Sequence, residues 1–332
     1  MKAWTITQPG AADVLQLHDT PAPEMGPTDV RVRVHAAGLN RADLLQRQGL
    51  YPAPAGASQD VPGLEYAGVI EEAGTNVQQR QPGERVMGLI GGGAYAEQVV
   101  VNERETIPVP GTLSLTEAAA VPEAFLTAYR GIFLEGGLQP GGWCLIRAAT
   151  SGIGIAGMQL TRAFGARTLG TSRSRERLER VRHWGLDVAH AEEDGSVLDA
   201  VRQNAGLGVD VVLDLLGGNG YLRENMDCLR PEGTQVVVGL MAGREDTLNM
   251  GLLLFKRLTL RAMTMRSLPL ERRIAMAQLF SDRLGPFFAE GRLKPVVDTV
   301  MPFDQAPEAH RLMESGAHTG KIVLSSEAAS GA

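Results

Sequence analysis

Cysteine, lysine and long apolar runs are scarce in this 332-residue chain. The two cysteines, Cys144 and Cys228, are too few for a disulfide framework or a cysteine-rich metal lobe. No stretch approaches the roughly 18 apolar residues of a membrane span, and no apolar segment follows Lys2 as it would in a secretory leader. We therefore expect a cytoplasmic protein without a membrane partner.

Arginine supplies nearly all the positive charge, because the chain has only four lysines (Lys2, Lys256, Lys294 and Lys321). The formal net charge of -6 counts against nucleic acid or a membrane surface as the partner of the whole chain. With 44% hydrophobic and 21% charged residues, the composition is that of an ordinary globular protein. The length exceeds the usual size of a single core, which predicts two domains.

The first third of the chain has the pattern of short strands punctuated by glycine and proline. Residues 29–38, DVRVRVHAAG, alternate apolar and polar side chains as a half-buried strand does. Further strands are predicted within residues 63–74, 83–90 and 94–101. This region is typical of an irregular antiparallel barrel or sandwich.

From about residue 142 the pattern changes to apolar strands that alternate with helices. Strands are predicted at 143–149, 167–172, 208–218 and 233–240, and helices at 153–164 and 174–184. This alternation indicates βαβ units and a parallel sheet. A last strand is predicted at 320–326, after a tail of mixed structure.

Residues 147–157, RAATSGIGIAG, place Gly152, Gly154 and Gly157 after a predicted strand and at the start of a predicted helix. A glycine inside a helix costs about 1 kcal/mol relative to alanine, so the cluster needs a compensating reason. The glycine pattern alone fits a tight turn without a ligand equally well. Its place between strand and helix favours a dinucleotide site, where N–H groups face a pyrophosphate and missing Cβ atoms allow close approach.

The next strand ends at Ser172, about 20 residues further on, where the ribose of a dinucleotide would lie. NAD-binding proteins tend to place a carboxylate there, but the sequence GTSRSRERLER has none before Glu176. Hydroxyl and guanidinium groups at this point instead suit a 2′-phosphate and predict NADPH. The candidate residues for that phosphate are Ser172, Arg173, Ser174 and Arg177. A solvated basic helix face is the alternative, and we prefer it for Arg175, Arg180 and Arg182.

Six segments in order resemble the medium-chain dehydrogenases/reductases, specifically the zinc-free, zeta-crystallin-like quinone oxidoreductases. They are AAGLNRADLLQRQGLYPAPAGAS, PGLEYAGVI, PGERVMGL, AFLTAYRGIF, LLFKRLTL and GKIVL, and the likeness covers nearly the full length. The NRAD and QRQG-x-Y elements are most similar to the tumour-suppressor-inducible quinone oxidoreductase branch. The resemblance implies an α/β protein with a GroES-like, mostly-β catalytic domain at 1–122, completed by 267–332. A Rossmann domain with a doubly wound parallel sheet would occupy 123–266 and bind NADPH.

The resemblance also implies further cofactor residues and a dimer. The family's AxxGxxG phosphate loop falls on Ala148, Ser151 and Gly154, with serine where many relatives have glycine. The implied cofactor residues are Ser151, Gly152, Ile153, Gly154, Gly217, Gly239, Leu240, Met241, Met265 and Arg266. A homodimer would pair through the sheet edge near 258–265. Relatives often carry a tyrosine over the adenine near Glu192, and a carboxylate there would weaken 2′-phosphate binding unless it faces solvent or pairs with an arginine.

Zinc-dependent members of the superfamily need Cys, His and carboxylate ligands, because a Lewis acid must stabilise a strongly basic alkoxide. The resemblance places Asn40 at their cysteine position and Leu64 at their histidine, and the six histidines are scattered without ligand spacing. We therefore expect no metal. A metal-free site favours quinones and conjugated enones, which delocalise the charge gained with the hydride.

Three residues are candidates for the chemistry in a cleft between the domains. Asn40 offers an amide donor and Tyr51 a hydroxyl, although a helix-capping asparagine and an amphipathic surface tyrosine are the structural alternatives. Thr127, in FLTAY, would hold the nicotinamide, and Asp43 would cap or orient the local turn.

These observations predict a zinc-independent NADPH:quinone oxidoreductase. An NADPH-dependent enone or enoyl-thioester reductase shares the fold and the hydride step and remains an alternative. A nucleotide-regulated RNA-binding or structural protein, as some zeta-crystallin relatives are, is an alternative of another class. The net charge opposes RNA, while the arginines from Arg162 to Arg182 form a local basic cluster.

Overall fold

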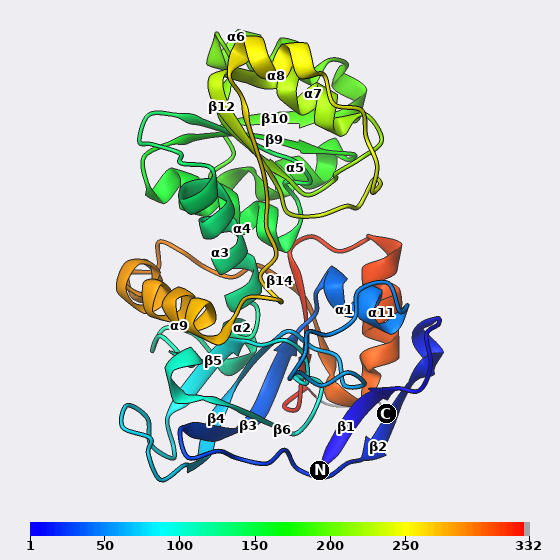
Figure 1. The fold of residues 1–332 in the computed structure, drawn as a ribbon, viewed down its shortest axis with the longest axis vertical. Helices are drawn as coiled ribbons and strands as arrows, with labels where there is room; N and C mark the ends of the chain where they lie inside the picture. The colour runs from blue at the N-terminus through cyan, green and yellow to red at the C-terminus, as the bar shows by residue number, and fades with distance from the viewer. Residues whose placement is uncertain (329–332) are drawn as a thin grey trace. The chain divides into compact units, whose positions relative to one another are not determined.

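The computed structural model describes residues 1–328, which form two compact units (Figure 1). The first unit comprises Met1–Glu123 and Met265–Ala332, and the second comprises Ala124–Thr264. Residues 329–332 of the predicted segment 267–332 lie outside the described residues. No helix within residues 1–328 is long and apolar enough to cross a membrane.

The first unit is built on a seven-stranded sheet with the order β14-β15-β3-β4-β5-β7, in which β6 also pairs with β3. The strands are β3 (Asp29–Gly38), β4 (Glu65–Ala73), β5 (Arg85–Leu89), β6 (Gln98–Asn102), β7 (Ile107–Pro108), β14 (Val297–Pro302) and β15 (Lys321–Ser325). All pairs are antiparallel except β14 with β15. An antiparallel pair of strands, β1 (Lys2–Ile6) and β2 (Leu15–Asp19), precedes these strands in the sequence and forms a separate two-stranded sheet.

The predicted strand at 29–38 is confirmed at both ends, because its apolar positions face the core. That core contains Val30, Val32 and Tyr66 from the sheet and Ala309 and Met313 from α11 (Ala306–Ser315). The remaining helices of this unit are α1 (Arg41–Arg47), α2 (Leu115–Ala118), α9 (Leu270–Leu279) and α10 (Gly285–Ala289). The strand predicted at 94–101 begins only at Gln98, although Ala96 makes a single bridge to Ala3.

The second unit is a six-stranded, all-parallel sheet with the order β10-β9-β8-β11-β12-β13. Its strands are β8 (Trp143–Ile146), β9 (Arg167–Ser172), β10 (Val188–Ala191), β11 (Val209–Asp214), β12 (Leu229–Val237) and β13 (Thr259–Ala262). The order reverses between β8 and β11, as in a doubly wound sheet, and ligands of such sheets bind at that switch point. The predicted Rossmann-type sheet is confirmed.

Helices cover both faces of this parallel sheet, with α6, α7 and α8 on one side and α4 and α5 on the other (Figure 1). They are α4 (Gly152–Ala163), α5 (Arg175–Val181), α6 (Val197–Ala205), α7 (Tyr221–Cys228) and α8 (Met250–Lys256), and α3 (Pro122–Tyr129) precedes them. The strand predicted at 143–149 ends at Ile146, because Ala148 has a positive φ of 54° and turns the chain. The helix predicted at 174–184 ends as a 3-10 turn at Arg182–Trp184.

Candidate active site

The glycine-rich turn joins β8 to α4 as predicted. Ser151 is the residue before the helix, and its Oγ accepts a hydrogen bond from the Gly154 N–H at 3.1 Å. A Cβ on Gly154 would lie 2.6 Å from the carbonyl oxygens of Ala148 and Ala149. A Cβ on Gly157 would lie 2.9 Å from Cδ1 of Ile146 in the strand. Gly154 is therefore required for the chain to make this turn, whereas a side chain at residue 157 would have to displace the tip of Ile146.

The end of β9 holds the residues predicted for a 2′-phosphate. Ser172 Oγ accepts from the Ser174 N–H at 3.3 Å, and Ser174 Oγ caps α5 by accepting from the Arg177 N–H at 3.3 Å. Thr150 of the glycine-rich turn lies with its Oγ1 3.4 Å from Ser172 Oγ. The structure thus brings the glycine-rich turn and the β9 end together, with Arg173 exposed beside them.

The three arginines predicted to form a solvated face all take part in ion pairs on the surface. Arg180 pairs with Glu176 at 2.6 Å and Arg182 with Glu179 at 3.3 Å. Arg175 pairs with Asp194 and, at 3.4 Å, with Glu193, two residues that directly follow Glu192. Burial, and next the charge of Glu192, raise the pKa of Tyr221, so Glu192 is close enough to influence that ring.

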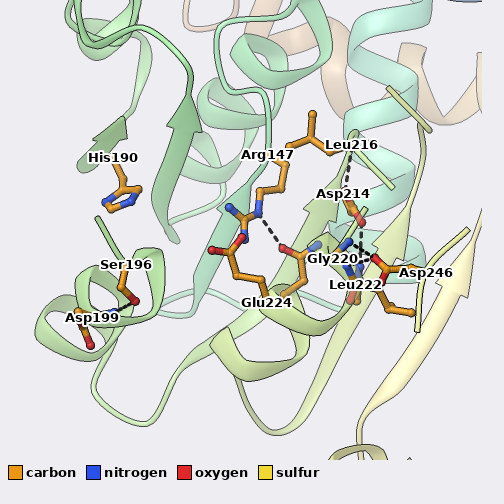
Figure 2. A network of polar contacts seen from close by, with 12 residues as sticks. Arg147, His190, Ser196, Asp199, Asp214, Leu216, Gly220, Leu222, Glu224 and Asp246 are labelled. Carbon is orange, nitrogen blue, oxygen red and sulfur yellow. Dashed lines mark hydrogen bonds and ion pairs between the residues drawn. The ribbon is translucent and has the colours of Figure 1, made fainter. Parts of the chain in front are cut away.

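A polar network that the sequence did not suggest lies at the carboxyl ends of β8 and β11 (Figure 2). Arg147 follows β8 directly and is 3% exposed. Its Nε donates to Asn225 Oδ1 and its Nη2 to Glu224 Oε2, both at 2.7 Å. The guanidinium lies 5.3 Å from the centre of the Tyr221 ring. An arginine between an apolar strand and a glycine-rich turn is the sequence signal that could have located this network.

A second part of the network fixes the turn that contains Gly217. Asp214, at the end of β11, accepts from the N–H groups of Leu216 at 2.9 Å and Gly217 at 3.0 Å, and burial raises its pKa. Asp246 accepts from the N–H groups of Gly220 and Leu222 at 2.9 Å (Figure 2). These carboxylates order the backbone at the switch-point end of the sheet.

The other predicted residues of the second unit lie after β12 and on α3. Gly239 follows β12, and a Cβ there would lie 2.7 Å from the Leu215 carbonyl oxygen. Leu240 and Met241 are both about half exposed, at 53% and 49%. Thr127 is buried on α3. Gly217 lies against Leu240, because a Cβ on Gly217 would be 2.7 Å from Leu240 Cδ2.

In the first unit, Asn40 precedes α1 and belongs to a buried polar cluster. Lys321 Nζ donates to Asn40 Oδ1 and to the Leu39 carbonyl, both at 2.7 Å, and forms an ion pair with Glu65. Asn40 Nδ2 donates to Glu65 Oε1 at 2.9 Å and to the Gly38 carbonyl at 3.3 Å. Glu65 is 0% and Lys321 5% exposed. The amide hydrogens of Asn40 therefore already face protein acceptors. A substrate oxygen would have to compete with these acceptors for the same hydrogens.

This cluster does not suit zinc. The Lys321 ammonium lies 2.7 Å from the Asn40 amide oxygen, and Leu64 is a buried apolar side chain beside Glu65. A cation in that place repels a divalent metal and supplies its own positive charge to Glu65. Within residues 1–328, no three His, Cys, Asp or Glu side chains are grouped so that they could hold a metal ion.

Asp43 caps α1 as predicted, since its Oδ2 accepts from the Asn40 N–H at 2.8 Å. Its Oδ1 accepts from the Gly63 N–H at 3.1 Å, and the Tyr95 hydroxyl donates to Oδ2 at 3.3 Å. Burial raises the pKa of Asp43 to about 6, against the opposing effect of the Asn40 hydrogen bond. The Tyr95 hydroxyl is also 3.3 Å from His310 Nε2, and burial lowers the pKa of that histidine to about 3.

Tyr51, Met265 and Arg266 also belong to the first unit. Met265 and Arg266 are buried, and Tyr51 is half-buried. The Arg266 side chain, predicted to bind the cofactor, donates to three acceptors of the first unit, among them the Tyr51 carbonyl at 3.0 Å. The Arg266 side chain is thus engaged with the loop that carries Tyr51.

Two family models match the chain: an alcohol dehydrogenase GroES-like domain over residues 26–111 and a zinc-binding dehydrogenase domain over 186–324. The rat synaptic vesicle membrane protein VAT-1 homolog is 30% identical over 98% of this chain and 84% of its own length. The bovine quinone oxidoreductase-like protein 2 is 31% identical over 92% of this chain and 87% of its own length.

Two solved structures share the whole fold. An NAD-dependent alcohol dehydrogenase has 32% identity and a TM-score of 0.87, covering 98% of this chain and 99% of its own. The Escherichia coli quinone oxidoreductase complexed with NADPH has 25% identity and a TM-score of 0.87, covering 98% of this chain and 100% of its own. The GroES-like and Rossmann-like units, their order and the extent of these matches lead to one conclusion: the chain belongs to the medium-chain dehydrogenase/reductase family.

Proposed function

We propose that this chain catalyses the NADPH-dependent reduction of quinones by hydride transfer without a metal ion. The observation that carries the proposal is the buried cluster of Lys321, Glu65 and Asn40, in which an ammonium group is the cationic partner of Glu65. The resemblance places Asn40 at the cysteine position of the zinc-dependent relatives. Without a Lewis acid, the acceptor must itself delocalise the charge that it gains, as quinones and conjugated enones do. The similarity to quinone oxidoreductase-like proteins supports the same substrate class.

The second unit would hold the cofactor, which supplies the hydride when bound. The first N–H groups of a helix have no acceptor within that helix. The Gly154 N–H is taken by Ser151 Oγ, so the N–H groups of Gly152 and Ile153 remain to face a pyrophosphate. Thr127 and the segment Gly239-Leu240-Met241 would position the nicotinamide. In the first unit, the Tyr51 hydroxyl would donate to the acceptor oxygen that gains charge.

The preference for NADPH would come from Arg173 and Arg177 with the hydroxyls of Ser172 and Ser174. The neighbouring acidic residues would oppose this preference, because their carboxylates repel a 2′-phosphate. Asp194 and Glu193 are engaged with Arg175, which lowers their effect, whereas Glu192 acts on Tyr221. The similar solved structures include both an NAD-dependent and an NADPH-complexed enzyme, so a direct comparison of NADPH and NADH binding decides between the two cofactors.

A substrate panel tests the reaction. Ortho- and para-quinones, enones, enoyl thioesters and alcohols are each offered with NADPH, and its oxidation is followed by absorbance before and after dialysis against a strong chelator. We expect turnover of quinones above that of the other classes, and no loss after dialysis. Preference for an enoyl thioester would favour the reductase alternative, and an activity that is lost on dialysis and restored by zinc would overturn the metal-free mechanism.

We also propose that the second copy in a homodimer covers the outer strand of the parallel sheet. Strand β13 ends the sheet order and pairs only with β12 among the described strands. The neighbouring helix α8 exposes the adjacent apolar side chains of Leu254 and Phe255, at 72% and 82%, and contiguous apolar surface of this kind marks interaction sites. Light scattering on Leu254→Glu/Phe255→Glu should give a monomer where the unmodified chain gives a dimer. A monomeric unmodified chain would contradict this arrangement.

A further inference from the structure

Arg266 holds both the backbone and the ring of Tyr51. The arginine is 3% exposed and is the second residue of the segment that completes the first unit. Its Nη1 donates to the Tyr51 carbonyl at 3.0 Å, and its Cζ lies 5.3 Å from the centre of the Tyr51 ring. Its Nε donates to the Gly91 carbonyl at 2.7 Å. One guanidinium therefore ties the start of the 51–59 loop to a second loop at Gly91.

Gln46 extends the same hold to the far end of the 51–59 loop. Its Oε1 accepts from Arg266 Nη2, and its Nε2 donates to the Gln59 carbonyl at 2.9 Å. The amide thus has its oxygen toward the arginine and its nitrogen toward the loop. Inside the loop, Gln59 Nε2 donates to the carbonyls of Pro54 at 3.2 Å and Ala57 at 3.0 Å. This chain of bonds is needed because residues 52–59 contain no helix or strand of their own.

We propose that Arg266 is a positioning residue that acts through Tyr51: together with Gln46 it fixes the 51–59 loop so that the tyrosine hydroxyl meets the acceptor. The proposal rests on the proposed function only for the acceptor, because the ordering of the loop is independent of any substrate. The planar guanidinium makes three divergent hydrogen bonds and faces an aromatic ring, a combination that a lysine ammonium cannot reproduce. Three of its five N–H groups are directed to acceptors in its own unit, which distinguishes this role from cofactor binding.

Hydrogen exchange tests the loop without reference to activity. Arg266→Lys and Arg266→Met should speed hydrogen exchange of the backbone amides between residues 50 and 60 by about tenfold or more. The reason is that the Tyr51 carbonyl, which anchors the loop, loses its hydrogen-bond donor. Gln46→Leu leaves the bonds of Arg266 to Tyr51 and Gly91 in place while it removes the bond to Gln59 and one acceptor of Arg266, so it should loosen the Gln59 end most and tests the hold on the loop if the Arg266 variants fail to fold. Arg104→Met, which removes only an exposed pair with Glu271, is the matched control and should change nothing in this loop. Unchanged exchange in the loop of the folded variants would overturn the proposal.

A double-mutant cycle tests the route through Tyr51. Arg266→Lys should lower kcat/KM for a quinone about tenfold while the Kd for NADPH stays within about twofold. In a Tyr51→Phe background, where the hydroxyl is already missing, the same change should cost less than about twofold. An equal loss in both backgrounds, or a raised Kd for NADPH, would refute the positioning role. If the unmodified chain reduces no quinone, the proposed function fails, while the exchange experiment still decides whether Arg266 orders the loop.

Discussion

Replacing Lys321 with methionine should destabilise the first unit by about 3 kcal/mol. The ammonium makes three hydrogen bonds inside the protein, to Asn40, Leu39 and Glu65, and it is the cationic partner of a carboxylate that is 0% exposed. Breaking a buried ion pair on one side typically costs about 3–5 kcal/mol, because the remaining charge stays buried. Glu65 would retain the Asn40 amide at 2.9 Å and the Glu123 N–H at 2.8 Å, which places the cost at the lower end.

The double variant Glu65→Gln/Lys321→Met separates the charge from the packing. It removes both charges, and an Asn40 amide released from Lys321 can turn its oxygen toward the new glutamine amide. Because a neutral, hydrogen-bonded network replaces the ion pair, we expect the double variant to be more stable than Lys321→Met by about 2 kcal/mol. Arg104→Met is the control, since its pair with Glu271 is exposed and should contribute less than about 1 kcal/mol.

The assay is a urea titration in which hydrogen exchange of the β3 and β15 amides reports on the first unit. A cost below about 1 kcal/mol for Lys321→Met would show that the buried ammonium is not compensating a buried carboxylate. A double variant as unstable as the single one would show that lost packing, and not the unpaired charge, dominates. Either result would remove the physical basis for regarding this cluster as the replacement of a metal.

Three further predictions concern the cofactor, the acceptor and pH. Arg173→Ala and Arg177→Ala should each raise the Kd for NADPH about tenfold in calorimetry and leave the Kd for NADH almost unchanged. The difference in Kd for NADPH between each variant and the unmodified chain should shrink at high salt. Equal affinity of the unmodified chain for both cofactors would contradict this prediction. Tyr51→Phe should lower kcat/KM for a quinone about tenfold at constant Kd for NADPH, and an unchanged rate would leave the hydroxyl without a catalytic role. Burial raises the pKa of Asp43 from 3.8 to about 6, so the folded chain binds a proton that the unfolded chain releases between these values. Relative to Asp43→Asn, the unmodified chain should therefore lose about 2 kcal/mol of stability as the pH rises from about 4 to about 6, and a constant difference would refute the raised pKa.

Local patterns in the sequence predicted most of the longer strands, because strand and helix periodicities are local properties, but they did not predict β1, β2, β7, β10, β13 or β14. The 29–38 strand was predicted to the residue, since burial follows the alternation of its side chains. The strand predicted at 143–149 was too long by three residues, because a positive φ at Ala148 leaves no mark in an apolar run. An alanine in that conformation is uncommon, and tertiary contacts must hold it there.

The partners in the polar clusters could not be predicted, because they are distant in the sequence. Lys321 reaches Asn40 across 281 residues, and Arg266 reaches Gln46 across 220. The sequence suggested an available amide at Asn40, whereas the fold directs that amide to Glu65 and Gly38. Hydrogen bonding of this kind depends on the sheet register that brings β15 beside β3, and single-sequence patterns do not contain that register.

The glycine-rich turn shows why a motif and a ligand site are separate conclusions. A Cβ on Gly154 would collide with the backbone of the preceding turn, and one on Gly157 would press on the Ile146 side chain, so packing alone gives a strong reason for Gly154 and a weaker one for Gly157. A phosphate is therefore favoured by the helix N-terminus and not by the glycines themselves. Ser151 takes the N–H of Gly154 with its side chain and that of Ile155 with its carbonyl. The N–H groups that precede them, on Gly152 and Ile153, point out of the helix start with the positive end of its dipole, and an anion is the ligand that such a pair favours.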